Sequence, residues 1–282
     1  MKERTRLAIQ GVAALLQNAN FRGFFTGTIY QGPVKRVCVP GLNCYSCPGA
    51  VGSCPIGSLQ NALSATRFRL PYYILGLLLF FGALLGRAIC GFLCPFGLLQ
   101  DLLYKIPFPK KIRSFRGDRL LRKLKYPVLL LMVIALPLMV KLTPVFCKYL
   151  CPSGTLSGIL LALGDPNLFA AMGWRFAWKL CVLVAVCSLS VVICRPFCRY
   201  LCPLGAIYAP MNRVSLLRLE LDRAACVHCG KCAAVCPMAV DPAAQPNHLE
   251  CIRCGKCIGS CPTRALHYGC AVSARPASTE EP

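Results

Sequence analysis

Long apolar runs separated by short polar segments dominate the chain up to about residue 212. Three of these runs predict membrane-spanning helices: Pro71–Ile89, Tyr126–Val140 and Trp174–Ile193. A span requires ~20 apolar residues, and the second run is short and contains Pro137. A fourth run, Leu7–Tyr30, contains several polar residues. It is interpreted as a further span, with an interfacial helix or a signal segment as the alternatives.

The distribution of basic residues predicts the orientation of these spans. Residues 87–125 carry ten basic side chains against two acidic ones, whereas residues 142–173 carry one of each. Lysine and arginine accumulate in cytoplasmic loops, so we expect the first segment inside and the second outside. If residues 7–30 also cross, the chain is an α-helical integral membrane protein of about four spans with both ends in the cytoplasm. A hydrophobic content of 56% and a mean hydropathy of +0.57 agree with this class.

A different pattern begins near residue 213, where the segments CVHCGKCAAVCP and CIRCGKCIGSCP each follow C-x2-C-x2-C-x3-C-P. This spacing is typical of bacterial two-cluster ferredoxins, in which the fourth cysteine of each segment ligates the other segment's cluster. It predicts two [4Fe-4S] clusters, one on Cys226, Cys229, Cys232 and Cys261 and one on Cys251, Cys254, Cys257 and Cys236. A zinc site, which closes with four ligands, explains this exchanged spacing poorly.

The expected domain organisation follows from these two patterns. Residues 1–212 are predicted to form the membrane domain, residues 213–270 a ferredoxin-like α+β domain, and residues 271–282 a flexible tail.

A second cysteine motif, Cys-Pro-x-Gly, occurs at four places in the membrane domain. Two copies lie at the predicted inner face, where GRAICGFLCPFG aligns with CRPFCRYLCPLG. Each copy carries cysteines four residues apart, which share one face of a helix. We therefore expect a third cluster on Cys90, Cys94, Cys198 and Cys202, with the charges of Arg87 and Arg195 offsetting its negative charge. The alternative is that these cysteines pack as small apolar side chains.

The other two copies lie at the predicted outer face. A fourth cluster is expected on Cys47, Cys54, Cys147 and Cys151, with a disulfide in the outer loop as the rival interpretation. Cys38 and Cys44 in the outer loop and Cys194 at the inner face are possible alternate ligands. The six outer thiols are enough for two clusters if the loop contributes more ligands. Because a hydrocarbon core of ~30 Å is too thick for one efficient electron-transfer step, we expect the outer and inner sites to dip inward on re-entrant half-helices, with a carrier between them as the alternative.

The combination of GRAICGFLCPFG, CRPFCRYLCPLGAIY and the two-cluster tail resembles the membrane polyferredoxins. This group includes the quinol-dehydrogenase membrane subunit of periplasmic nitrate reduction and the C-terminal part of the nitrous-oxide reductase expression regulator. The resemblance implies electron transfer in a bacterial inner membrane, with the clusters of the tail in the cytoplasm. The loop GPVKRVCVPGLNCYSCPGAVGSCPIG resembles that of a less characterised branch of the group.

The predicted function is that of an electron-transfer subunit, which relays electrons between a cytoplasmic partner and the membrane or the outer face. No catalytic residue is assigned. The chain has no C-x-x-C-H haem motif, dinucleotide fingerprint or phosphate-binding loop, so we expect a component of an oxidoreductase complex rather than a self-sufficient enzyme. The alternatives are a quinone-linked dehydrogenase component and an iron–sulfur redox sensor or maturation factor.

The expected partners follow from this function and from the charge of the chain. They are a ferredoxin, flavodoxin or dehydrogenase in the cytoplasm, an acceptor at the outer face, membrane lipid and quinone. Residues 105–125 are expected to contact anionic lipid headgroups, with the docking of an acidic ferredoxin or flavodoxin as the alternative. The net charge of +22 has no accompanying nucleic-acid motif, and basic flanks of membrane spans account for it.

Overall fold

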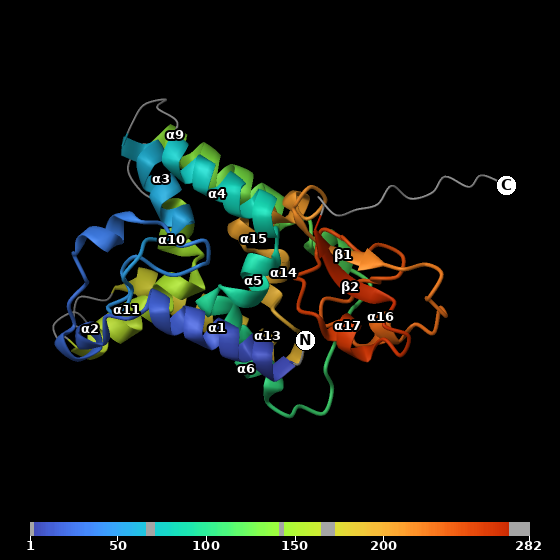
Figure 1. Ribbon diagram of the computed structural model, residues 1–282. Helices are drawn as coiled ribbons and strands as arrows, with labels where there is room; N and C mark the ends of the chain where they lie inside the picture. Colours follow the sequence, from blue (N-terminus) through green and yellow to red (C-terminus); the bar gives the residue numbers. More distant parts are fainter. Residues whose placement is uncertain (1–2, 66–70, 141–143, 165–172, 271–282) are drawn as a thin grey trace.

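The computed structural model describes residues 3–65, 71–140, 144–164 and 173–270, and the chain forms two parts that pack against each other. A helical part contains the first three-quarters of the chain, and a small part with two strands, residues 213–270, which we call the tail, lies at one end of it (Figure 1). The short helices α5 (Ala88–Phe92), α14 (Pro196–Tyr200) and α15 (Pro203–Met211) lie on the side of the helical part that faces the tail (Figure 1). The predicted flexible tail, residues 271–282, falls outside the described residues.

The helical part is built from many helices of unequal length. In chain order its elements are α1 (Glu3–Gln17), α2 (Phe21–Thr26), η1 (Pro33–Arg36), α3 (Pro55–Ala65), α4 (Tyr72–Leu85), α5 (Ala88–Phe92), α6 (Pro95–Lys105), α7 (Asp118–Leu121), α8 (Lys125–Pro127), η2 (Val128–Ala135), α9 (Leu136–Val140), α10 (Val145–Tyr149), α11 (Pro152–Gly164), α13 (Trp174–Val192), α14 (Pro196–Tyr200) and α15 (Pro203–Met211). Elements α8, η2 and α9 follow one another without a break, and η2 is π-helical.

The tail has the α+β composition that its cysteine spacing predicts. Its elements are β1 (Leu217–Leu221), α16 (Lys231–Ala234), α17 (Lys256–Ser260) and β2 (Leu266–Cys270). The two strands pair antiparallel, with Leu217 opposite Cys270 and Leu221 opposite Leu266. This pairing brings together the start and the end of the tail, so both cysteine segments lie between the strands in sequence.

The predicted spans are only partly reproduced. Among the described helices, only α13 is long and apolar enough to cross a membrane, while α4 and residues 152–163 form shorter apolar helices. The run 71–89 is interrupted because the chain turns at Gly86, which has a φ of 54° that side chains other than glycine rarely adopt. The run 7–30 is divided into α1 and α2.

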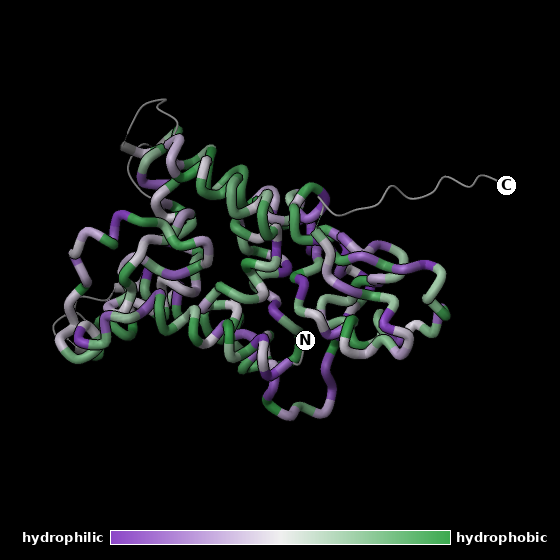
Figure 2. Tube along the Cα trace, viewed as in Figure 1, coloured by the Kyte–Doolittle hydropathy of each residue, from purple (hydrophilic) through white to green (hydrophobic). Residues whose placement is uncertain are grey.

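Helix α1 has its polar side chains inside and its apolar side chains outside. Arg6 and Gln10 are buried against α5 and α6, whereas Val12 and Leu16 are 58% and 68% exposed. Exposed apolar side chains also cover α4, where Phe80 is 62% exposed, and Figure 2 shows that α4 is predominantly hydrophobic. A soluble helix has the reverse arrangement, because water favours polar groups on the outside.

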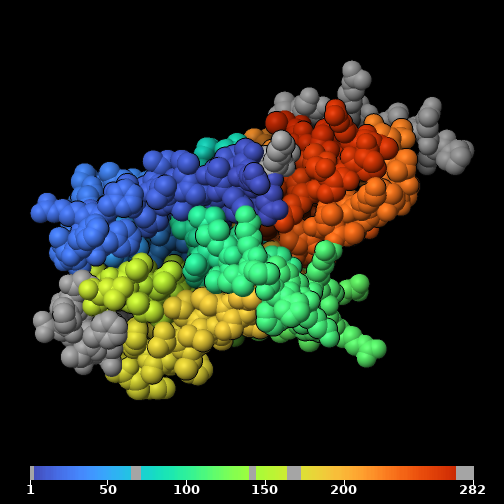
Figure 3. All heavy atoms as spheres, turned by 90° about the horizontal axis from the view of Figure 1, so that it is seen from below, coloured from blue at the N-terminus to red at the C-terminus, as the bar shows by residue number. Residues whose placement is uncertain are grey.

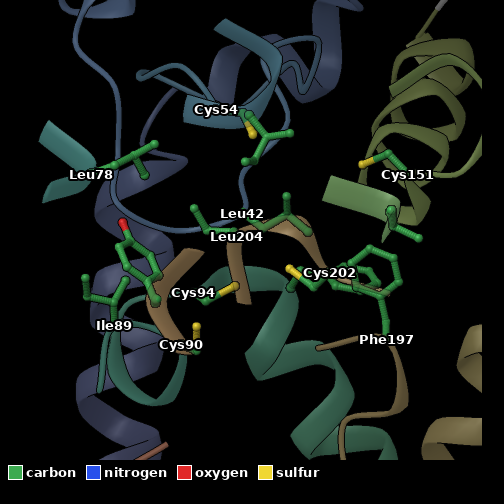
Figure 4. Close-up of a cluster of buried hydrophobic side chains, with 14 of the residues drawn as sticks. Leu42, Cys54, Leu78, Ile89, Cys90, Cys94, Cys151, Phe197, Cys202 and Leu204 are labelled. Carbon is green, nitrogen blue, oxygen red and sulfur yellow. The ribbon is translucent and has the colours of Figure 1, made fainter. Parts of the chain in front are cut away.

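The main hydrophobic core lies where the helices and the loop before α3 meet. Leu42 from this loop, Phe197 from α14 and Leu204 from α15 are at most 2% exposed and pack in one cluster (Figure 4). The same cluster contains Cys54, Cys94 and Cys151 with other cysteines, so the thiols of several motifs share one apolar interior.

We predict that Gly86→Ala destabilises the protein. A Cβ at this position would stand 2.6 Å from Oδ1 of Asn212 and 2.8 Å from Nη1 of Arg253, on a backbone that alanine adopts only at a cost of about 1–3 kcal/mol. The control is Gly76→Ala in α4, where a Cβ meets no described atom within 4 Å. Thermal unfolding should show a lower midpoint for the first variant alone, and equal midpoints would contradict the prediction.

Candidate iron–sulfur centres

Two cavities in the tail are each lined by four cysteines from both segments. The first, of about 120 Å³, is lined by a set that we call the first tail site: Cys226, Cys229, Cys232 and Cys261. The second, of about 20 Å³, is lined by a set that we call the second tail site: Cys236, Cys251, Cys254 and Cys257. The structure thus brings together both of the exchanged sets that the spacing predicts, each around its own space.

The two tail segments adopt the same backbone turns. His228 and Arg253, the residues before the second cysteine of each segment, have φ values of 51° and 52°. The glycines after that cysteine, Gly230 and Gly255, have φ values of 67° and 74°. Left-handed residues on both sides of this cysteine curve the main chain around the thiols, and glycine adopts this conformation without strain. His228 therefore holds a turn position; it also lines the first cavity.

The tail thiols are suited to a cationic ligand. Burial raises the pKa of Cys251 to about 11 and that of Cys257 to about 12, so both are protonated at neutral pH when no cation compensates their charge. Iron binding would displace these protons, because the thiolate is the ligating form. Among the residues that the structure describes, no three His, Cys, Asp or Glu side chains are grouped as closely as the ligands of a single metal ion. A cubane binds each thiolate through a different iron, so its ligands stand wider apart.

Four buried cysteines form what we call the inner site. They are Cys90, Cys94, Cys198 and Cys202, each at most 4% exposed. Cys94 and Cys202 precede the first residues of α6 and α15, and their sulfurs accept hydrogen bonds from the amides of Gly97 and Gly205. Figure 4 shows Cys90, Cys94 and Cys202 side by side. Cys-Pro-x-Gly is therefore a helix-start motif that fixes a thiol at the helix N-terminus.

Each of the two inner-site arginines donates a hydrogen bond to the main chain of the other repeated motif. Arg87 donates through Nη2 to the carbonyl of Cys198 at 3.2 Å, and Arg195 donates through Nη1 to the carbonyl of Cys90. Both side chains are fully buried. Each arginine therefore binds the main chain at the first cysteine of the Cys-x3-Cys pair in the other copy. The sequence alone does not reveal this exchange. Whether they also offset the charge of a cluster stays a prediction.

Three buried carboxylates each pair with two cationic side chains around the inner site. Asp101 accepts hydrogen bonds from Arg195 at 2.6 Å and Arg6 at 2.8 Å. Glu250 pairs with Arg87 at 2.5 Å and also with Lys125. The third, Asp118, pairs with Arg122 and Arg199 and accepts a hydrogen bond from the Tyr200 hydroxyl.

The ionisation of the Glu250 group follows from its burial and its partners. Burial alone would raise the pKa of Glu250, but the charges of Arg87 and Lys125 lower it to about 2. Sequence reasoning missed this group, because its members are distant in the chain.

The outer thiols gather in a pattern that differs from the predicted one. A cavity of about 420 Å³ is lined by four cysteines. We call this set the outer site: Cys44, Cys54, Cys147 and Cys151. The thiols of Cys44 and Cys151 lie equally close to Gly154, 3.8 Å from the position of an added Cβ. The structure therefore brings Cys54, Cys147 and Cys151 together as predicted, with Cys44 as their fourth member.

Cys47 and the possible alternate ligands Cys38 and Cys194, the last of them predicted at the inner face, lie outside this cavity. Cys47 does not line it; its thiol accepts hydrogen bonds from main-chain amides of its own turn and from Ser157. Cys38 donates a hydrogen bond to the Ser58 hydroxyl at 3.5 Å. Cys194 is buried, and its charged neighbours include Asp101 and Arg195. All 22 cysteines, each of them in the described part of the chain, are free thiols rather than disulfides.

Comparisons with known proteins match both parts of the chain. A family model described as a 4Fe-4S binding domain matches residues 70–116, 124–168 and 174–221, and a 4Fe-4S dicluster domain matches residues 218–262. The methylamine utilization ferredoxin-type protein MauN of Paracoccus denitrificans is 30% identical over 67% of this chain and 62% of its own length. The ferredoxin-type protein NapH of Haemophilus influenzae is 27% identical over 58% of this chain and 52% of its own length.

A third relative has a regulatory name. The regulatory protein NosR of Stutzerimonas stutzeri is 31% identical over 58% of this chain and 22% of its own length. The chain thus spans at most about three-fifths of the length of these relatives. No solved structure matches the chain.

We predict that Glu250→Gln lowers the stability of the fold by about 3–5 kcal/mol, because it leaves Arg87 and Lys125 buried without their carboxylate. The matched control is Glu220→Gln, since the Glu220 side chain is 35% exposed and pairs with His267 at 3.5 Å. Thermal unfolding at pH 7 should separate the two variants.

The pH dependence of the Glu250 contribution has a definite sign. The pKa of Glu250 falls from 4.5 to about 2 on folding, so its stabilising effect is complete above pH 4.5 and declines as the pH falls toward 2. The difference in unfolding midpoint between the parent protein and Glu250→Gln should therefore shrink over this range. A constant difference from pH 7 to pH 3 would contradict the assignment.

Proposed function

This chain belongs to the ferredoxin-type 4Fe-4S electron-transport proteins, and on that premise we propose that it relays electrons through four [4Fe-4S] clusters. The first and second tail sites, the inner site and the outer site hold one cluster each and act in that order or its reverse. A [4Fe-4S] cluster, when bound, takes up and releases single electrons. The chain's own residues fix the sites relative to one another and keep water out of the path.

The contact between the second tail site and the inner site carries this proposal. A Cβ added to Gly91, which lies between Cys90 and Cys94, would stand only 2.5 Å from the carbonyl oxygen of Ile252, which lies between Cys251 and Cys254. The two ligand-bearing turns therefore touch through their main chains, with no side chain between them. Such a short separation favours electron transfer from the second tail site rather than from the first.

Buried hydrogen bonds support a rigid junction at this contact. Arg253 donates to the carbonyls of Leu85 at 2.8 Å and Asn212 at 2.9 Å. The Asn212 side chain donates to the carbonyl of Cys251 at 2.7 Å and accepts from the amide of Arg87 at 2.9 Å. The tail is thus tied to the helical part at the residues beside the ligands, which keeps the distance between the two sites constant.

The loop before α3 supports the next step, from the inner to the outer site. A Cβ on Gly41 would stand 3.1 Å from the Cα of Cys94, and Pro40 accepts a hydrogen bond from the hydroxyl of Tyr208 at 3.1 Å. The loop that carries the outer ligand Cys44 therefore reaches the inner site. Tyr208 is fully buried and lies near thiols of both sites, including Cys94 and Cys54. This arrangement shortens the path that a ~30 Å hydrocarbon core would otherwise impose.

A membrane location, with residues 1–212 in the bilayer and the tail in the cytoplasm, is part of the proposal. Apolar side chains of α1, α4 and α13 face outward, as in a bundle surrounded by lipid. Helices α3 and α11, which begin at the outer cysteines, are 11 and 13 residues long and suit half-helices that enter from one face. The proposal keeps four crossings, at α1, α4, the α8–α9 segment and α13, and of these four only α13 has the length and hydropathy of a full span.

Single cysteine substitutions test the composition of the outer site. We predict that Cys44→Ser removes one cluster and that Cys47→Ser removes none, because only the first thiol lines the outer cavity. Iron analysis of anaerobically purified protein should then give about twelve irons per chain for the first variant and about sixteen for the second, at four per cubane. Loss of iron in Cys47→Ser alone would support the original sequence assignment instead.

The junction between the second tail site and the inner site has its own test. We predict that Gly91→Ala slows electron transfer from the tail to the outer site while all four clusters remain bound, because the new Cβ pushes Ile252 away. Gly158→Ala in α11 is the control, since a Cβ there meets no described atom within 4 Å. Rapid-mixing reduction of protein in vesicles, with iron content measured in parallel, checks this. An unchanged rate in Gly91→Ala would show that electrons take another route.

A further inference from the structure

A basic and apolar segment projects from the helical part beside the tail. Residues 105–124, which we call the interfacial segment, carry eight basic side chains and a single acidic one, Asp118. Asp118 is buried, so the exposed charges of the segment are all positive. Large apolar side chains alternate with them: Leu120 is 75% exposed, Phe108 46% and Phe115 40%. In Figure 3 this segment extends away from the body of the molecule.

The interfacial segment is fixed in position rather than loosely attached. The amide of Ile112 donates to the carbonyl of Val192, the last residue of α13, at 3.0 Å. Arg199 of α14 donates to the carbonyl of Arg113 at 2.9 Å and also pairs with the buried Asp118. These contacts hold the segment level with the end of α13, the one described helix that is long and apolar enough to cross a membrane.

The position and the composition of the segment identify the surface that it would contact. At the end of a span the hydrocarbon gives way to lipid headgroups, where exposed apolar side chains reach acyl chains and basic side chains reach phosphates. Leu189, one turn before the end of α13, is 48% exposed, so the outward apolar surface of that helix continues toward the segment. A purely electrostatic docking site for a soluble protein would leave these exposed leucine and phenylalanine side chains without a role.

A cavity of about 1030 Å³ lies between the interfacial segment and residues 239–250 of the tail. Arg116, Arg119 and Lys123 line one side of it. Of the acidic residues in its wall, Asp118 and Glu250 form buried ion pairs, and Asp241 accepts hydrogen bonds from the main-chain amides of Ala243 and Ala244. The excess of cations suits the phosphate group of an anionic lipid.

We propose that the interfacial segment binds the anionic phospholipid surface of the membrane and thereby positions the tail. Arg122 of this segment donates to the carbonyl of Met238, two residues after the cluster ligand Cys236, at 2.9 Å. Lipid binding at the segment is therefore transmitted to the second tail site by this hydrogen bond from the Arg122 side chain. The inference rests on the membrane location in the proposed function, and it adds the lipid class and the residues that recognise it.

Fluorescence quenching in vesicles tests the proposal on the full-length, cluster-loaded protein. Leu120→Trp places a reporter at the most exposed apolar position of the segment, and the signal of Trp174 and Trp178 is removed by subtracting the parent protein. Brominated phosphatidylglycerol should quench the reporter more strongly than brominated phosphatidylcholine at equal mole fraction. A variant with Lys110, Arg116 and Arg119 changed to Gln lacks three basic side chains of the segment. Its preference for phosphatidylglycerol over phosphatidylcholine should fall on the order of a hundredfold, at about fivefold per residue.

A matched variant controls for net charge. It changes three exposed basic residues outside the segment, Arg36, Arg223 and Arg264, to Gln, and it should keep the lipid preference. Equal quenching by both lipids would overturn the recognition of anionic lipid, and no quenching by either would overturn membrane contact. The proposal also fails if an added acidic ferredoxin, rather than lipid, protects the reporter's fluorescence from quenching by the soluble quencher acrylamide. Iron content is measured in parallel, so loss of clusters, which would undermine the relay itself, is distinguished from loss of lipid binding.

Discussion

The structure depends on hydrogen bonds that two buried arginines donate at the inner site, each to the cysteine turn of the opposite copy. Arg87 and Arg195 occupy equivalent places in the repeated motifs, and each donates to the first cysteine carbonyl of the other copy. A guanidinium group this deeply buried is costly unless a carboxylate pairs with it, so Glu250 and Asp101 are required for the same geometry. The thiols are thus positioned by ion pairs that lie outside the cysteine motifs themselves.

The two ion pairs connect different parts of the protein, so the two copies of the repeat have different surroundings. Asp101 links Arg195 to Arg6 of α1, so that pair stays within the helical part. Glu250 precedes the second tail site directly, so the Arg87 pair joins the helical part to the tail. A nearly symmetric repeat therefore presents one of its two faces to the tail and the other to α1.

Sequence patterns predicted those sites whose ligands are set by local spacing. Both tail sets agree with their cavities residue by residue, because a C-x2-C-x2-C turn fixes three ligands within one short loop. The choice between Cys44 and Cys47 depended on the path of a long loop, and spacing contains no information about that path. The partners of Arg87 and Arg195 were also beyond sequence reasoning, since Glu250 lies far from Arg87 in the chain.

The length of the helices was predicted least well, and the reason is physical. Hydropathy detects apolar residues but not the points at which the chain must turn to place a thiol. At Gly86 the backbone changes direction so that Arg87 and Cys90 reach the inner site, and the apolar run continues through the turn to Ile89. The same need brings polar side chains of α1 inward, where Gln10 donates to the carbonyl of Cys94 at 3.0 Å. Cysteine turns at helix ends expose carbonyls inside an apolar bundle, and those carbonyls need buried donors such as Gln10, Arg87 and Arg195.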